Sequence, residues 1–318
     1  MLYIEGGSVT ELFTRAVTAV VSEGRTVSPR GTPTLEVMPA HLCLAAPRAR
    51  LLDASCGRRI NPAFAAAEAV WVLAGSDAPW IFGFNARLRE FADGGVLHGA
   101  YGPRLRAWPG APAAIDQLAQ ARRLLIDDPE TRRATVCLFD PSRDFADVRD
   151  VPCTVTWRFF IRDGLLEMHT TMRSQDLWLG LPYDVFTATV LQELMAGWCG
   201  VEVGAYHHEV SSLHLYRRDL AAAAEVRSPT GTPPSDPARL AVSWGRLPSL
   251  VEGLLAGAPV IEPGWEGISG VLRSYLLWRA GHRQYARDLA LATSGELARM
   301  LDRWYDHLSA ERPRAVAS

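Results

Sequence analysis

Two side chains in apolar stretches of the sequence are suited to covalent and acid–base chemistry. Cys153 stands at the start of a predicted strand, and Glu68 interrupts the otherwise apolar face of a predicted helix. A thiolate is a strong nucleophile, although a free cysteine is more often a small buried hydrophobic residue. An isolated buried carboxylate is costly, yet a desolvated carboxyl group with a raised pKa suits proton transfer. The sequence therefore contains a candidate nucleophile and a candidate acid–base group, each with a structural alternative.

The 33 cationic residues are all arginine, because the sequence contains no lysine. This absence excludes a P-loop lysine and a Schiff-base lysine, and coding bias is its simplest explanation. Any anion site must therefore be built from guanidinium groups, which hold phosphates in a fixed, two-pronged geometry. The net charge of −2 argues against a protein that binds nucleic acid through bulk positive charge.

Metal, membrane and export signals are weak. His207, His208 and Glu209 are adjacent, but consecutive residues of a strand point to opposite faces, so we expect no metal site. The five cysteines are scattered and odd in number, which fits a reducing compartment. The sequence has neither a signal peptide nor a stretch of about 18 apolar residues. We therefore expect a cytoplasmic protein without a membrane or nucleic-acid partner.

Hydrophobic spacing predicts the elements that must position these side chains. Ser8 and Glu11 form a capping box before the first helix, and Asp163-Gly164 favours a tight hairpin turn. The alternation of helices and strands predicts an α/β fold whose sheet is buried by helices. We expect helices at 8–21, 62–73, 112–126 and 184–198, and strands at 35–44, 131–138, 153–162, 165–171 and 204–210.

The last quarter of the sequence has a different character. Residues 227–239, RSPTGTPPSDPAR, are typical of an exposed linker. Amphipathic helices are expected beyond it, at 247–255, 270–280 and 294–308. We therefore expect one domain over residues 1–318, with a core of about 8–225 and a helical C-terminal region at 240–318.

Short motifs spread over most of the sequence occur together in one known family. They are Arg30-Gly31-Thr32, Glu68 within EAVWVLAG, Tyr101-Gly102, Arg106-Ala107-Trp108, Arg132-Arg133, VPC at 151–153, MRSQD at 172–176, LGLPYD at 179–184 and LHLY at 213–216. With these motifs in order over roughly residues 8–220, the sequence resembles the thymidylate synthase family. The resemblance implies an α/β (α+β) fold with a large mixed sheet, a homodimer, and 5,10-methylenetetrahydrofolate as co-substrate, with no metal.

The resemblance also assigns roles to individual residues. Cys153 would add to carbon 6 of a pyrimidine as a thiolate, which nearby guanidinium charge would favour. Glu68 would be the general acid–base group that organises water near the base. The other implied contacts are Arg30, Arg173 and Ser174, with Arg132 and Arg133 of the second subunit, for the phosphate; His214 and Tyr216 for the sugar; and Asp176, Leu179, Gly180, Tyr183 and Leu88 for the folate.

One position departs from the synthases, because Asp184 stands where they carry asparagine. An asparagine amide pairs with the N3 proton and O4 of uracil, whereas cytosine presents an N3 acceptor and an amino donor. A carboxyl group can accept from the amino group while a proton shared with N3 completes a second bond. Unpaired polar groups against the wrong base discriminate by orders of magnitude. Aspartate is the pattern of the cytidylate hydroxymethylases of the family; the alternative is a tolerated substitution in a uridylate enzyme.

Two further departures favour hydroxymethylation over methylation. Leu88 and Phe91 stand where the synthases carry tryptophans that shelter the methylene intermediate, and the C-terminus is predicted to be helical and lacks the closing tail. A less sheltered methylene group can be trapped by water. We therefore expect a cytidylate 5-hydroxymethyltransferase that acts on CMP or dCMP. The alternatives are a thymidylate synthase that methylates dUMP and a non-catalytic nucleotide- or RNA-binding regulator.

Overall fold

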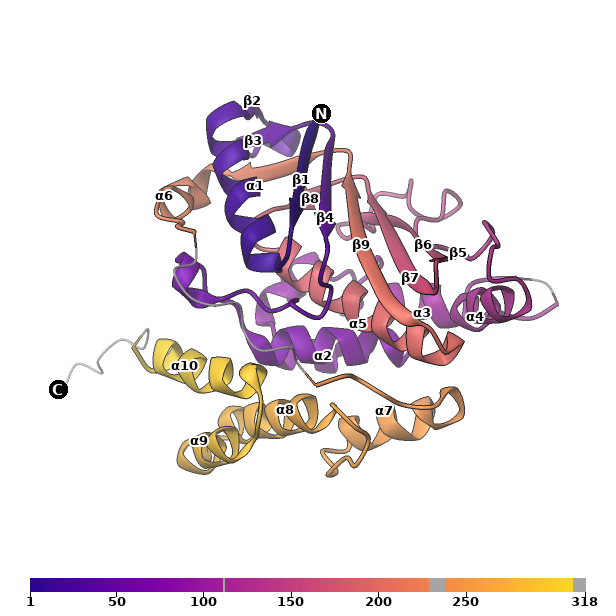
Figure 1. The fold of residues 1–318 in the computed structure, drawn as a ribbon. Coiled ribbons are helices and arrows are strands. Elements are labelled where there is room, and N and C mark those ends of the chain that lie inside the picture. Colours follow the sequence, from indigo (N-terminus) through magenta and orange to yellow (C-terminus); the bar gives the residue numbers. More distant parts are fainter. Residues whose placement is uncertain (111, 229–237, 311–318) are drawn as a thin grey trace.

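The fold is built around a large mixed sheet, and the computed structural model describes residues 1–110, 112–228 and 238–310. The large sheet has six strands in the order β1 (Leu2–Gly6), β4 (Ala40–Leu44), β9 (Glu202–Val210), β7 (Leu165–Met172), β6 (Thr154–Arg162) and β5 (Thr135–Cys137) (Figure 1). A smaller sheet beside it has the order β2 (Arg25–Val27), β3 (Thr34–Val37), β10 (Leu213–Tyr216) and β8 (Gln175–Asp176). The predicted α/β class is confirmed.

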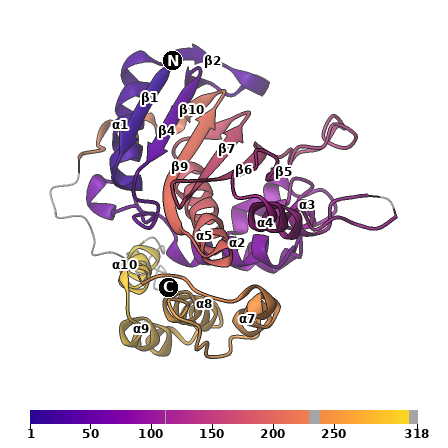
Figure 2. The same cartoon turned by 45° about the vertical axis from the view of Figure 1, so that its right-hand side comes forward.

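Helices cover one face of the large sheet. Helix α1 (Val9–Glu23) packs on β1 and β4, α4 (Gln117–Asp127) on β5 and β6, and α5 (Leu181–Cys199) on β7 and β9 (Figure 2). Alternate residues of β7 reflect this asymmetry: Met168 and Thr170 are buried, whereas Glu167 and His169 on the opposite face are half-buried. The face away from α5 is therefore a half-exposed surface of polar side chains.

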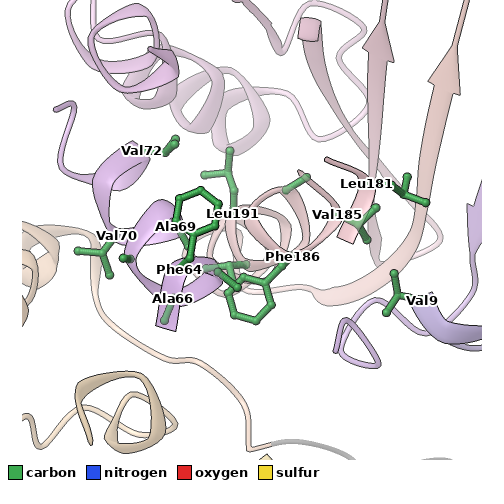
Figure 3. Packing of buried hydrophobic residues seen from close by; sticks show 14 of the residues in the cluster. Val9, Phe64, Ala66, Ala69, Val70, Val72, Leu181, Val185, Phe186 and Leu191 are labelled. Carbon is green, nitrogen blue, oxygen red and sulfur yellow. The ribbon is translucent and has the colours of Figure 1, made fainter. Parts of the chain in front are cut away.

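Helix α2 (Pro62–Leu73) lies in a middle layer, between α5 and the C-terminal helices. Phe64 of α2 packs with Phe186 and Leu191 of α5 (Figure 3). The outer side of α2 meets α7 (Leu247–Leu255), α8 (Glu266–Arg279) and α10 (Glu296–Ala310), and α9 (Arg283–Ala292) packs on α8 and α10. A helix that is apolar all round is buried on all sides, and α2 meets this expectation. Glu68 is the one charged residue within it.

Most predicted elements are confirmed, with shifted ends. Helix α2 has the predicted bounds, and Asp163-Gly164 forms the turn between β6 and β7 with φ of 50° and 74°. The predicted helix at 112–126 begins only at Gln117, because Asp116 caps it through a bond to the Ala119 N–H. The predicted strand at 131–138 is shorter, spanning Thr135–Cys137. Strand β1 and helix α9 were not predicted, and α3 (Tyr101–Arg106) and α6 (Leu220–Ala224) are short additional helices.

Parts of two predictions fall outside the described residues. Residues 229–237 of the predicted linker and the last residues, 311–318, lie there. The division of the chain into a core, a linker and a helical region stays a prediction. In the described part of the chain, no helix is both long enough and apolar enough to cross a membrane.

Candidate active site

Cys153 lies directly before β6, in a loop that Arg173 holds. The Nε and Nη2 atoms of Arg173 donate to the carbonyl oxygens of Pro152 and Val151, each at 2.9 Å. The backbone N–H of Arg173 donates to the carbonyl of Cys153 at 2.9 Å. Nη2 then lies 3.7 Å from Sγ of Cys153. The segment before β8 therefore fixes the thiol beside a guanidinium group.

Burial is the dominant influence on this thiol, and it raises the pKa of Cys153 to about 11. The Arg173 charge lowers the pKa, as expected, whereas the nearby carboxylates of Asp184, Asp150 and Asp176 raise it. Desolvation disfavours the thiolate more strongly than one cation favours it. The subunit without ligand therefore holds Cys153 as a thiol at neutral pH.

A pH profile of alkylation tests this state of Cys153. Because the pKa of about 11 lies above the range of an ordinary thiol, the thiolate fraction should still rise about tenfold per pH unit from about pH 8 to pH 10. We expect the rate of iodoacetamide modification of the Cys153 peptide, followed by mass spectrometry, to rise with it. A small reference thiol levels off near pH 9. A plateau for Cys153 at or below that pH would contradict the effect of burial.

Two carboxyl groups from α2 and α5 form an electrostatically coupled pair. Burial and the charge of Asp184 raise the pKa of Glu68 to about 8, and Thr187 Oγ1 donates to Glu68 Oε2 at 3.5 Å. Burial and the charge of Asp176 raise the pKa of Asp184 to about 6, although a bond from Gln175 opposes the shift. At neutral pH, Glu68 is therefore mostly protonated and Asp184 mostly ionised. Environments that separate two carboxyl pKa values in this way are typical of acid–base sites.

Asp184 is held by Gln175, a residue not included among the predicted site residues. Gln175 Nε2 donates to Asp184 Oδ2 at 2.8 Å and to the Asp176 carbonyl at 3.2 Å. A carbonyl oxygen can only accept, so the amide nitrogen, and not the amide oxygen, must face Asp184. A Cβ atom at Gly180 would lie 2.7 Å from this nitrogen, which explains the glycine there.

The hydrogen bonds continue behind Gln175 into the sheet. His208 Nε2 lies 2.8 Å from Gln175 Oε1, and His208 Nδ1 lies 2.8 Å from the Tyr206 hydroxyl. Burial lowers the pKa of His208 to about 3, so the ring is neutral and carries one N–H. That N–H is on Nε2, because Gln175 Oε1 only accepts. A buried chain of hydrogen bonds from Tyr206 through His208 and Gln175 therefore makes Asp184 Oδ2 a fixed acceptor. The part played by Gln175 and His208 depends on how the strands are paired, which the sequence does not show.

The strands of the smaller sheet bring the predicted sugar and folate residues together. His214 of β10 is paired with Asp176 of β8, and the rings of His214 and Tyr216 meet edge to face with centroids 5.2 Å apart. Asp176 Oδ1 accepts the N–H groups of Trp178 and Leu179, each at 2.9 Å. Burial raises the pKa of Asp176 and of Tyr216. One Asp176 oxygen is thus committed to the backbone.

The remaining predicted folate residues lie at the start of α5 and in a 3-10 turn. The Tyr183 hydroxyl accepts the Asn61 N–H at 2.9 Å, and its ring meets Phe64 edge to face at 4.8 Å between centroids. Tyr183 therefore has a structural bond in addition to any contact with a ligand. Leu88 is half-buried in the turn Ala86–Phe91, whereas Phe91 is 48% exposed.

The predicted phosphate-binding arginines fall into two groups. Arg30 is exposed with φ of 51°, and its charge partly offsets the rise in the pKa of Tyr216 that burial causes, as expected for a neighbour. Arg132 and Arg133 are exposed just before β5. Within the described residues, neither of their guanidinium groups has a hydrogen-bond or ion-pair partner. The subunit brings Arg30 and Arg173 to the site but shows no contact of Arg132 or Arg133 with it.

The region of the chain that contains this site is similar to known proteins. Residues 11–236 match the family model described as thymidylate synthase. The chain belongs to the thymidylate synthase family. It is 34% identical to a deoxyuridylate hydroxymethyltransferase of Bacillus phage SP01 over 233 residues, 70% of this chain and 61% of that protein. It is 32% identical to a thymidylate synthase of Listeria monocytogenes serotype 4b (strain CLIP80459) over 152 residues, 46% of this chain and 48% of that protein. The aligned region spans less than two thirds of either relative.

Tyr101 is a residue of this thymidylate synthase-family site that was quoted in a motif but not given a role. Its buried hydroxyl accepts the N–H of Thr154, the residue after Cys153, at 3.2 Å. Burial, with the charges of Asp184 and Cys153, raises its pKa. Tyr101 therefore lies within electrostatic reach of both groups and helps to fix the start of β6. The Tyr101-Gly102 motif was the signal that could have identified it.

The helices beyond the matched thymidylate synthase region support α2 from outside. Asn61 caps α2 by accepting the N–H groups of Ala63 and Phe64 at 3.1 and 3.2 Å. Its Nδ2 donates to the Phe84 carbonyl at 2.9 Å and to the Tyr275 hydroxyl of α8 at 3.5 Å. Tyr275 also stacks on Phe84 with centroids 5.3 Å apart. The C-terminal layer thus stabilises the beginning of the helix that carries Glu68.

Proposed function

We propose that this chain is a cytidylate 5-hydroxymethyltransferase, which transfers a one-carbon unit from 5,10-methylenetetrahydrofolate to carbon 5 of CMP or dCMP. Water would complete the 5-hydroxymethyl group. The observation that carries this proposal is Asp184, a carboxyl group in the base-reading position whose Oδ2 is a fixed acceptor for Gln175.

An ionised Asp184 matches cytosine better than uracil. A carboxylate only accepts hydrogen bonds. Cytosine with a proton on its basic N3 offers two adjacent donors, N3–H and the 4-amino group, to the two carboxylate oxygens. Uracil offers one donor, and its O4 acceptor would face the negative charge. The pKa of about 6 leaves Asp184 ionised at neutral pH but close enough to share a proton with N3.

The other residues support covalent activation of the base. Cys153 Sγ would add to carbon 6 and make carbon 5 electron-rich for attack on the one-carbon unit. Loss of the carbon-5 proton and cleavage of the bond between the methylene carbon and the folate nitrogen would then leave an exocyclic methylene group on the base. Water would add to this group, and Sγ would be expelled from carbon 6. Glu68, protonated at neutral pH, would donate and receive protons beside the base. Tetrahydrofolate would be released without oxidation.

Hydroxymethylation rather than methylation is supported by two observations. Phe91 is 48% exposed and Leu88 is half-buried where tryptophans are expected in a synthase. The phage relative is itself named as a hydroxymethyltransferase. Because that name specifies deoxyuridylate, hydroxymethylation of dUMP is the second candidate function. Methylation of dUMP and a non-catalytic binding role have less support from this site.

Release of tritium from carbon 5 distinguishes these substrates. With 5,10-methylenetetrahydrofolate present, we expect labelled CMP or dCMP to release tritium at least about 100-fold faster than labelled dUMP. Faster release from dUMP would contradict cytosine recognition and favour the second candidate. Absence of release from all three nucleotides would favour the non-catalytic role.

A homodimer with shared phosphate sites is part of the same proposal. Arg132 and Arg133 are exposed and unpaired within the described chain, so each pair would be available to the nucleotide of the other subunit. Mixing a Cys153→Ser variant with an Arg132→Ala/Arg133→Ala variant should restore roughly a quarter of the wild-type activity through hybrid dimers. The two variants would be refolded together and the formation of hybrid dimers confirmed. Hybrid dimers without activity would contradict the shared site.

A further inference from the structure

A second cluster of chemically active side chains lies on the face of the large sheet away from α5. Glu167 and His169 of β7 and His207 of β9 place ligand atoms within 4.8 Å of one another. Glu167 Oε2 lies 3.8 Å from His169 Nε2 and 3.9 Å from His207 Nε2. The two imidazoles are paired in the strand register and stack with centroids 4.3 Å apart. One carboxylate oxygen and two imidazole nitrogens therefore converge on one point.

The far side of His169 is held by a fixed carboxylate. His169 Nδ1 lies 3.4 Å from Glu209 Oε1. Arg158 Nη2 and Thr171 Oγ1 donate to the other oxygen of Glu209 at 2.7 and 3.1 Å. A histidine that binds a metal usually donates its second N–H to such a carboxylate, which sets the tautomer and the ring orientation. His169 Nε2 is thereby left as a lone-pair donor directed toward Glu167.

The far side of His207 is held in a similar way by another ring. His207 Nδ1 lies 3.1 Å from His41 Nε2 of β4. With Nδ1 engaged by His41, Nε2 of His207 is the nitrogen that faces Glu167. Both histidines of the cluster therefore use Nδ1 for orientation and present Nε2 to the same carboxylate. This is an arrangement of inner ligands and outer supports found in metal sites.

We propose that Glu167, His169 and His207 bind one divalent transition-metal ion, and that zinc is the cation they fit best. Two imidazoles and one carboxylate are a common zinc ligand set, with the fourth tetrahedral position left for water or a group of another molecule. Bond lengths near 2.0–2.1 Å require ligand atoms about 3.4 Å apart, so the side chains need to move inward by about half an ångström.

This site is separate from the candidate active site and does not depend on the proposed function. His207 and Glu209 lie on the uncovered face, whereas His208 is buried on the opposite face and bonds to Gln175. Consecutive residues of β9 thus point to opposite faces, as predicted, and His207, His208 and Glu209 cannot all bind one metal. The absence of any metal was nevertheless the expectation, and this proposal departs from it because Glu167 and His169 join the cluster from the neighbouring strand.

Zinc titration of the full chain, freed of metal with a chelator, tests the site. We expect one zinc ion per chain by isothermal titration calorimetry, with at least about 100-fold weaker binding in His169→Gln and His207→Gln. Glu209→Gln should weaken binding by about 10- to 100-fold, because it removes only an outer support. His282→Gln replaces an exposed histidine at the start of α9, outside the sheet, and this control should bind zinc as the wild type does.

Cobalt provides a readout that does not depend on affinity alone. Tetrahedral Co²⁺ bound at the site should give a visible absorption band that disappears in His169→Gln and His207→Gln. Zinc should also raise the unfolding temperature of the wild type and leave those two folded variants unchanged. Sub-stoichiometric binding by the wild type would overturn the proposal. Equal binding by the wild type and both histidine variants would overturn it too, and would assign the metal to other groups.

Discussion

Replacing Cys153 by serine should reduce turnover by a factor on the order of 10⁴ or more, with nucleotide binding retained. The proposed reaction begins with Sγ adding to carbon 6, and a serine hydroxyl at the same position is a much weaker nucleophile. The loop geometry should survive, because Arg173 holds it through the backbone carbonyls of Val151, Pro152 and Cys153. Tritium release and equilibrium binding of the same nucleotide measure the two effects separately.

Cys137→Ser is the matched control for this prediction. Cys137 is exposed on β5 and takes no part in the proposed chemistry, so its replacement should leave turnover unchanged. A Cys153→Ser variant with wild-type turnover would exclude covalent catalysis by this thiol. It would favour instead a protein that binds nucleotides without transforming them.

Asp184→Asn should shift the kcat/KM preference from cytidylate toward uridylate by about 10²- to 10⁴-fold. The amide offers one donor and one acceptor, which match O4 and N3–H of uracil, whereas the carboxylate offers two acceptors. Gln175 Nε2 would donate to the amide oxygen, so the oxygen end of the asparagine would be fixed and its NH₂ group free for O4. Steady-state kinetics with CMP, dCMP and dUMP measure the ratio.

Gln175→Met separates base recognition from general disturbance of the site. Methionine has a similar volume but lacks the donor, so Asp184 loses its fixed orientation without gaining a new hydrogen-bond pattern. We expect about a tenfold fall in kcat/KM for the cytidylate, with the order of base preference unchanged. An Asp184→Asn variant with the base preference of the wild type would contradict the role given to Asp184.

Elements whose ends are set by neighbouring residues, such as caps and turns, were predicted well from the sequence. The bounds of α2 follow from the Asn61 cap and the apolar run that Gly75 ends, and Asp163-Gly164 determines the hairpin between β6 and β7. The start of the next long helix was misplaced because its cap is Asp116, the fifth residue of the predicted range. Strand β1 is short and its pairing with β4 is parallel, so no nearby turn signals it.

The site could be predicted only as a set of residues, since the contacts among them depend on tertiary register. The family motifs predict Cys153, Glu68 and Asp184 as site residues. The bonds that orient Asp184 come from Gln175 of β8 and His208 of β9, which meet only because the two sheets lie together. The same limit applies to Glu167, whose contact with His207 requires the pairing of β7 with β9.

Electrostatic properties of the site also depend on burial that the sequence does not reveal. Nearby guanidinium charge was expected to favour the Cys153 thiolate, but burial raises the pKa of this thiol despite the charge of Arg173. The pKa of Glu68 could not be predicted from the sequence: burial raises it, and the charge of the neighbouring Asp184 adds to the same effect. The separation between the pKa values of these two carboxyl groups therefore emerges only when α2 and α5 are packed together.

Identification of the products is the most direct test of the proposed cytidylate hydroxymethylation. The purified protein would be incubated with 5,10-methylenetetrahydrofolate and CMP, dCMP or dUMP, and nucleotide and folate products would be analysed by mass spectrometry. We expect 5-hydroxymethyl-CMP or 5-hydroxymethyl-dCMP with an equal amount of tetrahydrofolate. Formation of thymidylate and dihydrofolate from dUMP, with no conversion of either cytidylate, would contradict the proposal.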